Sequence, residues 1–221
     1  MTRVFKIEKT HADIVSKATL FKVLKYLDKK KIETPVLFMD RDRIKERLSL
    51  IGSNIRGSRV FYAVKANNHK DSLKLIKSLG MGFEIASDGE LRTLAEIGVG
   101  PERIITSNPV KSVKFIKYAV SYGVRYFAFD SEEEVAKLSK HAPGSSVYIR
   151  LSVPNEGSEW PLSRKFGVEP DAALKLLCLA KEKGLDPAGI TFHVGSQCLN
   201  LYSWNTAIYK ARVLWESVSQ K

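Results

Sequence analysis

Short hydrophobic runs alternate with longer amphipathic stretches along most of the chain. Runs rich in β-branched and aromatic residues predict strands over residues 35–39, 60–66, 82–86, 104–107, 126–129, 147–153 and 189–194. Stretches with apolar residues at helical spacing predict helices over residues 71–79, 88–97, 112–122, 131–141, 170–183 and 202–218. Asp71, Asp88 and Ser131 are the expected N-caps, and several of these stretches end on glycine. The pattern predicts a repeated βα unit.

The expected strands recur at a nearly constant interval. Those that start at residues 82, 104, 126 and 147 are 22, 22 and 21 residues apart, which predicts parallel strands with right-handed crossovers. A doubly wound nucleotide-binding sheet carries a glycine-rich turn after its first strand, and none is present. In a barrel, polar residues at the carboxyl ends of strands mark the active face, and such residues end or follow six expected strands: Lys65, Glu84, Asn108, Asp130, Arg150 and His193. The predicted fold class is therefore α/β, a (β/α)8 TIM barrel.

Composition and charge exclude several classes of protein. Of the 221 residues, 44% are hydrophobic and 27% charged, as in an ordinary globular chain. The net charge of +12 comes largely from lysines and arginines placed between apolar residues at helical spacing, which predicts a solvated helix face rather than a nucleic-acid interface. No apolar run approaches the roughly 20 residues of a membrane span, and Cys178 and Cys198 lack metal-ligand spacing. We expect a cytoplasmic protein that binds no nucleic acid, membrane or metal.

Lys65 is the most informative single residue. It lies in the otherwise apolar run Phe61-Tyr62-Ala63-Val64-Lys65-Ala66-Asn67, which a parallel sheet would bury on both faces. Burial lowers the pKa of an ammonium group and leaves a nucleophilic amine, as a Schiff base with an aldehyde requires. The alternative is a lysine at a strand end whose amine reaches solvent. The residues at the neighbouring strand ends favour the first interpretation.

Polar residues at three other strand ends suit a phosphorylated aromatic ligand. His193, in Thr191-Phe192-His193-Val194-Gly195-Ser196, presents a flat imidazole for stacking, and Ser196 and the amide groups of the turn suit a phosphate. A lone histidine beside a strand can equally be a hydrogen-bonded core side chain. Arg150 and Glu84 lie within apolar runs and each needs a polar or charged partner.

Seven ordered runs carry a family resemblance, which extends from about residue 34 to the end: Tyr62-Ala63-Val64-Lys65-Ala66-Asn67, Gly82-Phe83-Glu84-Ile85-Ala86-Ser87, Pro101-Glu102-Arg103-Ile104-Ile105, Ser107-Asn108-Pro109-Val110-Lys111, Phe129-Asp130-Ser131-Glu132, Leu162-Ser163-Arg164-Lys165-Phe166-Gly167 and Phe192-His193-Val194-Gly195-Ser196. They closely resemble the eukaryotic-type ornithine decarboxylases. More broadly they resemble the fold-type III pyridoxal-phosphate decarboxylases, which also act on diaminopimelate, arginine, lysine and carboxynorspermidine. The resemblance implies a barrel of the alanine racemase-like type and a pyridoxal phosphate cofactor.

The resemblance assigns a role to each candidate site residue. Lys65 matches the lysine that binds pyridoxal phosphate as a Schiff base, and His193 matches the histidine stacked on the pyridine ring. Ser196 resembles the family's phosphate contact, Glu84 the acidic residue beside the imine, and Arg150 an arginine of the cofactor pocket. Lys65 and His193 are thus the implied catalytic residues, and all five are implied to bind the cofactor.

Two details qualify these assignments. The family usually has aspartate where this chain has Glu84, so the charge is kept while the reach of the carboxylate is longer. Asp130 and Lys165 resemble a charged pair between a strand end and a loop.

Parts of the family pattern are missing from this sequence. Counting from residue 60, about six of the eight strands of a barrel are present. A Gly-Gly-Gly phosphate loop, a Glu-Pro-Gly run and a Cys-Asp-Gly motif do not occur. We expect residues 1–40 to be an N-terminal segment with one strand of a β domain, and residues 41–221 an incomplete pyridoxal-phosphate-binding barrel. The C-terminal β domain is expected to be absent, and open strand edges would leave the isolated chain without full activity.

The function that the resemblance implies is decarboxylation of a basic amino acid. L-ornithine, converted to putrescine in polyamine biosynthesis, is the expected substrate, and the full-length form is expected to be a homodimer. The stretch from Val153 to Leu162 resembles bacterial ornithine or ornithine/lysine decarboxylases.

Two alternatives stay open at this point. One is a non-catalytic regulator similar to the antizyme inhibitors, against which the retention of Lys65, His193 and Ser196 argues. The other is a single-domain pyridoxal-phosphate homeostasis protein, which differs in the motif around the lysine. Amino-acid racemases share the fold, but the runs that contain His193 and Lys165 resemble those of decarboxylases.

Overall fold

The structure is a computed structural model that describes residues 17–33, 35–154, 165–196 and 198–219. The chain divides into two compact units, Met1–Asn54 and Ile55–Lys221. The larger unit contains the strands β1 (Phe61–Ala63), β2 (Gly82–Glu84), β3 (Ile104–Ile105), β4 (Tyr126–Phe129), β5 (Ser146–Leu151) and β6 (Asp186–Phe192). Its helices are α3 (Lys70–Ser78), α4 (Asp88–Glu96), α5 (Val113–Tyr122), α6 (Glu132–His141), α7 (Pro170–Glu182) and α8 (Leu201–Ser219), with short 3-10 turns η1 (Val64–Ala66) and η2 (Pro101–Arg103).

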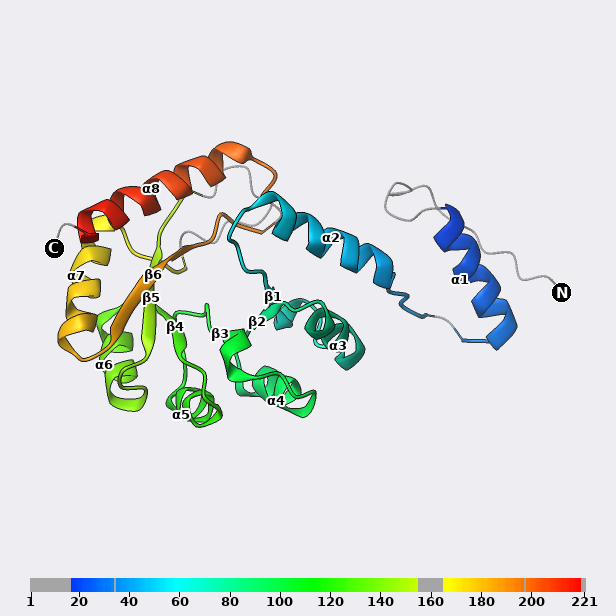
Figure 1. Ribbon diagram of the computed structural model, residues 1–221, viewed down its shortest axis with the longest axis horizontal. Helices are drawn as coiled ribbons and strands as arrows, with labels where there is room; N and C mark the ends of the chain where they lie inside the picture. The colour runs from blue at the N-terminus through cyan, green and yellow to red at the C-terminus, as the bar shows by residue number, and fades with distance from the viewer. Residues whose placement is uncertain (1–16, 34, 155–164, 197, 220–221) are drawn as a thin grey trace. The chain divides into compact units, whose positions relative to one another are not determined.

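The strands of the larger unit are parallel and follow one another in chain order. β1, β2 and β3 pair in sequence, as do β4, β5 and β6, and a parallel bridge between Thr106 and Phe127 joins the two sets. Helices α3 to α7 lie along one side of this wall (Figure 1). A doubly wound sheet reverses its strand order part-way, whereas a barrel wall does not. The predicted α/β barrel is therefore confirmed, with six of its strands among the described residues.

Side chains alternate between the two faces of the wall, so the strand register decides which residues face the barrel interior. Phe127 and Phe129 of β4 pair with Val147 and Ile149 of β5, and all four are fully buried beneath the helices. The alternate residues of β5, among them Arg150, consequently face inward. Polar side chains that end the strands are thereby brought to one end of the interior.

Serine residues begin several helices of the larger unit. The hydroxyl groups of Ser87, Ser112 and Ser131 accept backbone N–H groups of the first turn of α4, α5 and α6. Ser131 was the predicted cap of its helix, whereas Asp88 lies inside the first turn of α4 rather than capping it. The carboxylate of Asp88 still opposes the positive end of the helix dipole. α5 ends as predicted on Gly123, whose φ of 100° is left-handed and favours glycine.

The smaller unit contains α1 (Lys17–Lys30) and α2 (Arg41–Asn54). The strand predicted over residues 35–39 is wrong, because the described residues there form no regular secondary structure. A strand needs a neighbour to accept and donate its hydrogen bonds. Asp40 instead starts α2, where its carboxylate accepts the backbone N–H groups of Asp42 and Arg43. The assignment of residues 1–40 to a further β domain stays a prediction.

Candidate active site

Four of the five candidate site residues come together at the carboxyl ends of the strands. Lys65 follows β1, Glu84 ends β2, Arg150 lies near the end of β5, and His193 follows β6. Lys65 and Arg150 each interact electrostatically with both Glu84 and His193. The end of the barrel thus carries two cations, one carboxyl group and one imidazole within range of one another.

Glu84 is the buried member of this cluster, with 8% of its surface exposed. Its Oε1 atom accepts the backbone N–H of Ser107 at 3.3 Å. Burial raises the pKa of this carboxyl group, against the opposing effects of Lys65, the Ser107 hydrogen bond and Arg150. Glu84 therefore takes up a proton more readily than an exposed glutamate does.

The expected burial of Lys65 is wrong. β1 ends at Ala63, and the chain turns into η1, which carries the Lys65 side chain out of the sheet to an exposed position. Its neighbour Val64 takes the fully buried place instead. The amine of Lys65 is therefore accessible to a ligand at this end of the barrel.

His193 is held in one orientation by the turn that follows it. Its Nδ1 atom accepts the backbone N–H of Gly195 at 2.9 Å, so the proton of the neutral ring lies on Nε2. Gly195 has a φ of 97°, in the left-handed region. Partial burial lowers the pKa of His193, and the cations Arg150 and Lys65 lower it further. These effects favour a neutral imidazole.

Arg150 is half-buried, and its guanidinium group lies over the ring of Phe166 at 5.2 Å from the centroid. Burial lowers its pKa, while the carboxylates of Asp130 and Glu84 raise it. Within the described parts of the chain, its N–H groups form no hydrogen bond and no ion pair. These donors are suited to an anionic ligand.

The predicted role of Ser196 stays a prediction, whereas the predicted charged pair of Asp130 with Lys165 does not form. Ser196 is exposed in the loop between β6 and α8, and none of the contacts described for it joins it to the other four residues. The prediction that Asp130 and Lys165 form a charged pair is wrong, because no ion pair joins them among the described residues. Asp130 Oδ2 accepts the backbone N–H of Gly167 at 2.8 Å instead, while Lys165 is exposed.

Lys111, in the loop after β3, forms a buried ion pair with Glu134 of α6, and this pair was not predicted from the sequence. Lys111 Nζ lies 2.9 Å from Glu134 Oε1, with 0% and 4% of the two side chains exposed. The same ammonium group donates to the carbonyls of Asn108, Pro109 and Ala128. Burial lowers the pKa of Lys111 to about 8, against the opposing effect of Glu134.

A sequence signal for the pair existed. Glu134 lies at the third position after the cap Ser131, where a capping-box carboxylate would turn back to the cap, and it contacts Lys111 and Lys137 instead.

Asn108, expected at the active face, closes its own turn by hydrogen bonds with the backbone of Val110.

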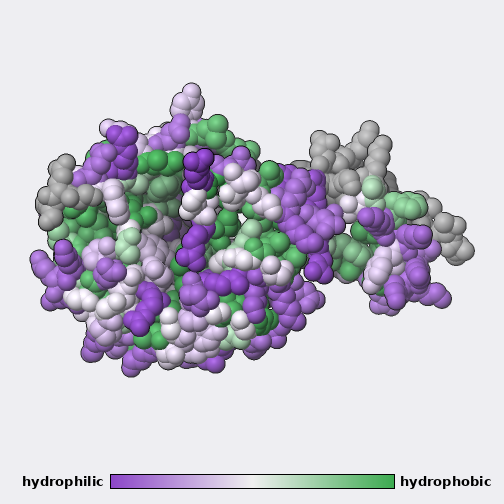
Figure 2. All heavy atoms as spheres, in the orientation of Figure 1, coloured by the Kyte–Doolittle hydropathy of each residue, from purple (hydrophilic) through white to green (hydrophobic). Residues whose placement is uncertain are grey.

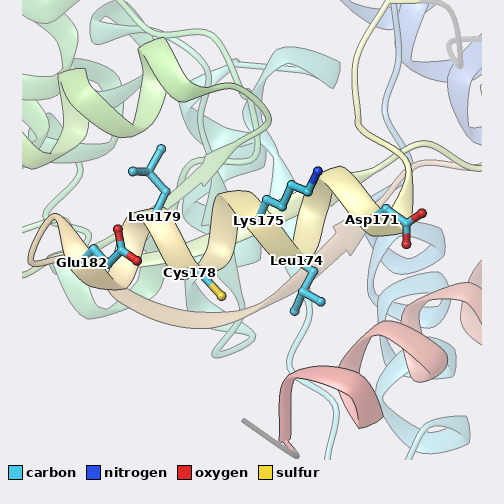
Figure 3. A pocket seen from close by; sticks show the side chains of 6 residues that line it. All are labelled: Asp171, Leu174, Lys175, Cys178, Leu179 and Glu182. Carbon is cyan, nitrogen blue, oxygen red and sulfur yellow. The ribbon is translucent and has the colours of Figure 1, made fainter.

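A hollow on the outside of the larger unit lies apart from this cluster. Its volume is about 550 Å³, and every residue that lines it projects from α7, as Figure 3 shows: Asp171, Leu174, Lys175, Cys178, Leu179 and Glu182. A neighbouring hollow of about 580 Å³ reaches Asp186 and Pro187, at the opposite end of β6 from His193. Neither hollow contains any of the candidate site residues, so the chemistry of the strand ends and not the size of a cavity identifies the site.

Both cysteines are free thiols, and no three His, Cys, Asp or Glu side chains in the described ranges could hold a metal ion. No helix in those ranges is long and apolar enough to cross a membrane. The stretch from Val153 to Leu162, which resembles bacterial decarboxylases, lies largely outside the described residues.

Residues 41–221 match the family described as pyridoxal-dependent decarboxylase, pyridoxal binding domain. The chain belongs to this family. The match includes every residue of the cluster at the strand ends, and the predicted resemblance and cofactor class are confirmed.

Relatives and solved structures support the same family. The lysine/ornithine decarboxylase of Selenomonas ruminantium is 38% identical over 86% of this chain and 49% of its own length, and the ornithine decarboxylase of Caenorhabditis elegans is 36% identical over 83% and 44%. A crystal structure of the Selenomonas ruminantium lysine decarboxylase matches with a TM-score of 0.83 at 36% identity, over 93% of this chain and 53% of that one. The arginine decarboxylase of Paramecium bursaria Chlorella virus matches with a TM-score of 0.86 at 26% identity, over 90% and 55%. The chain spans about half the length of the relatives it matches.

The residues at the strand ends fit a pyridoxal phosphate cofactor. Lys65 presents an accessible amine, and Arg150 presents N–H groups for which the described residues supply no acceptor. His193 presents an imidazole whose pKa is lowered by partial burial and, further, by the cations Arg150 and Lys65. An amine, a flat neutral ring and an anion-binding cation are the groups that an aldehyde-bearing, phosphorylated pyridine requires.

Proposed function

We propose that the protein is a pyridoxal-phosphate-dependent decarboxylase of basic amino acids whose substrate is L-ornithine and whose product is putrescine. The observation that carries the proposal is the convergence of Lys65, Glu84, Arg150 and His193 at the carboxyl ends of four strands. Active sites of barrel enzymes occupy this end. Membership of the pyridoxal-dependent decarboxylase family supports the reaction class.

Each residue has a distinct task in the proposed reaction. Lys65 binds the cofactor covalently through Nζ, and Glu84 balances the positive charge close to that nitrogen. His193 offers the neutral face of its imidazole for stacking, and its proton stays on Nε2 because Nδ1 is occupied by the Gly195 N–H. Arg150 and Ser196 bind anionic oxygens. When bound, pyridoxal phosphate supplies a sink for the electron pair released as the substrate carboxyl group leaves as CO2.

The role of Lys65 can be tested independently of turnover. We expect borohydride reduction in the presence of pyridoxal phosphate to fix a label on the peptide that contains Lys65. Lys65→Ala should lose that label, whereas Lys70→Ala should keep it, because Lys70 is exposed and pairs with Glu96 on the outside of the unit. A label that persists in Lys65→Ala would overturn the assignment.

The choice of ornithine rests on the relatives, which include enzymes named for ornithine and for both lysine and ornithine. The test compares CO2 release from carboxyl-labelled ornithine and lysine at matched concentrations. We expect a higher kcat/KM for ornithine. A higher value for lysine would leave the reaction class intact and replace the substrate.

A regulator without catalytic activity is the second candidate. Antizyme inhibitor 2 of Xenopus laevis is 39% identical over 72% of this chain and 35% of its own length. Retention of Lys65, His193 and Ser196 favours the enzyme, because a binding partner has no need of a cofactor-binding lysine. The regulator is favoured if protein that binds the cofactor at Lys65 releases no CO2 from either amino acid.

The remaining features of the proposal follow from the family resemblance. We propose a homodimer in polyamine biosynthesis, to be tested by the molar mass in sedimentation equilibrium with cofactor present. Two free thiols are consistent with a reducing compartment, and we place the enzyme in the cytoplasm.

A further inference from the structure

A short segment, residues 165–168, runs beside the carboxyl end of β5 and is called the strap below. Val168 forms a parallel bridge with Leu151: its N–H donates to the Arg150 carbonyl at 3.0 Å, and its carbonyl accepts the Ser152 N–H at 2.9 Å. Leu151 also pairs with Phe192 of β6. A strand has two hydrogen-bonding sides, so the strap occupies the side of β5 opposite β6.

The strap approaches β5 too closely for any residue except glycine at position 167. Gly167 has a φ of 95°, and a Cβ atom there would lie 2.7 Å from the Ser152 nitrogen and 2.8 Å from the Leu151 carbonyl carbon. Both neighbours are backbone atoms that cannot move aside cheaply. Asp130 Oδ2 fixes the same residue from the end of β4 by accepting its N–H at 2.8 Å. The strap is therefore held from β4 and β5 together.

This attachment places Phe166 directly on the guanidinium group of Arg150. The guanidinium carbon lies 5.2 Å from the ring centroid, within the range of a cation–π contact. The carboxylates of Asp130 and Glu84 act on the same cation. A planar cation with an aromatic ring on one face keeps its N–H edge free for an anionic oxygen.

We propose that Phe166 is a positioning residue for Arg150, holding the guanidinium edge toward an anionic oxygen of the bound ligand. The inference rests on the proposed function for the identity of that ligand. The anionic oxygen belongs either to the phosphate of the cofactor or to the carboxylate of the amino acid. The two sources share the same chemistry and differ in which binding step the strap supports.

The test replaces Phe166 by leucine, which keeps an apolar side chain and removes the ring. We expect Phe166→Leu to weaken anion binding by roughly three- to tenfold, as the loss of a partly desolvated cation–π contact does. Weaker binding of pyridoxal phosphate with unchanged binding of pyridoxal assigns the contact to the phosphate. Unchanged cofactor binding with a raised KM for ornithine assigns it to the substrate carboxylate. If neither changes, the inference is wrong.

A second readout does not depend on activity. His193 is acted on by Arg150 and Lys65, so displacement of the Arg150 cation should raise the pKa of His193 in an NMR titration. Phe166→Trp, which keeps an aromatic face, should restore both the binding and the titration. A purely structural role for Phe166 predicts loss of folding without recovery in the tryptophan variant, and that result also overturns the inference.

The chain offers a matched control. Arg92 lies over the ring of Tyr118 at 4.7 Å, between α4 and α5 on the outside of the barrel wall. Tyr118→Leu removes the same kind of contact away from the site and should leave cofactor binding and the His193 titration unchanged. If the unaltered protein binds no pyridoxal phosphate at all, the proposed function fails. If the unaltered protein binds pyridoxal phosphate and Phe166→Leu gives the same result in every measurement, only the proposed role of Phe166 is wrong.

Discussion

Single side chains at the carboxyl ends of the strands alter one another's ionisation. The cations Lys65 and Arg150 lie close enough to Glu84 and His193 to lower the pKa of both. Burial acts in opposite directions on the two groups, raising the pKa of the acid and lowering that of the imidazole. At Glu84 burial outweighs the two cations and its pKa is raised, whereas at His193 burial and the cations act together and lower the pKa.

The titration of His193 predicts a dependence of stability on pH. Its pKa in the folded protein lies below the ordinary value of 6.5, so the unfolded chain binds more protons between those two values. The free energy of unfolding should therefore fall as the pH drops through about 6.5. In urea denaturation at a series of pH values, His193→Gln should lose less stability on acidification than the unaltered protein. Equal losses in the two proteins would contradict the assigned direction.

Tyr148 lies on β5, two residues before Arg150, and is linked to Glu84 through hydrogen bonds with Ser107. Its hydroxyl group donates to the carbonyl of Thr106 at 2.5 Å and also bonds to Ser107, whose N–H reaches Glu84. We expect Tyr148→Phe to lower the free energy of unfolding by about 1 kcal/mol, the usual value of one such hydrogen bond. It should also raise the pKa of Glu84 further, because the Ser107 N–H is then held less firmly.

The control for Tyr148 is another tyrosine that donates to a backbone carbonyl. Tyr122 on α5 donates to Val99 at 2.6 Å, outside the barrel interior. Tyr122→Phe should cost a similar amount of stability without moving the ¹³C NMR titration of the Glu84 carboxyl group. If both variants leave that titration unchanged, Tyr148 has no effect on Glu84.

Helices and strands fix the position of the site through the loops that join them. The loop between β3 and α5 supplies the Ser107 N–H to Glu84, and Lys111 at the end of the loop is anchored to Glu134 on α6. The ammonium group also binds the carbonyl of Ala128 on β4. The buried ion pair thus connects the loop before α5 with β4 and α6.

A double-mutant cycle measures what this buried pair contributes. Lys111→Met alone leaves Lys137 as the ion-pair partner of the Glu134 carboxylate among the described residues, and should lower the free energy of unfolding by roughly 3 kcal/mol. Lys111→Met combined with Glu134→Leu should recover part of that loss, since neither charge is then left buried. The exposed pair of Lys70 with Glu96, at 2.7 Å, is the matched control and should contribute less than about 1 kcal/mol. Equal coupling energies in the two cycles would show that burial adds nothing.

The sequence predicted those parts of the fold that depend on local pattern. All six βα units were predicted, because hydrophobic periodicity and capping residues such as Ser131 act over only a few positions of the chain. The exposure of Lys65 could not be read from the same pattern, since the run around it is apolar whether the strand ends at Ala63 or continues. The contact of Phe166 with Arg150 depends on the path of a loop over β5, and hydrophobic periodicity contains no information about such a path.

In the larger unit of the molecule, α8 and the loop before it carry a group of exposed apolar side chains. Leu199, Leu201 and Tyr202 are 89%, 75% and 79% exposed, and Ile208 and Trp215 are each 55% exposed. Figure 2 shows green hydrophobic residues among purple ones on the larger unit. Strand β6, next to α8 in the chain, has β5 as its partner strand among the described residues. Surface of this kind promotes association between molecules.

A charge placed on this surface should therefore reduce self-association of the 221-residue chain. Ile208→Lys adds an ammonium group at an exposed position in the middle of α8, where lysine has a good helix propensity, so the helix should stay folded. We expect sedimentation velocity at a series of protein concentrations to show a smaller associated fraction than for the unaltered chain, with unchanged circular dichroism. Val120→Lys on α5, where the side chain is 37% exposed, adds the same charge away from α8 and separates a local effect from that of net charge. An equal reduction in both variants would mean that the overall charge of the chain, rather than the apolar face of α8, governs its association.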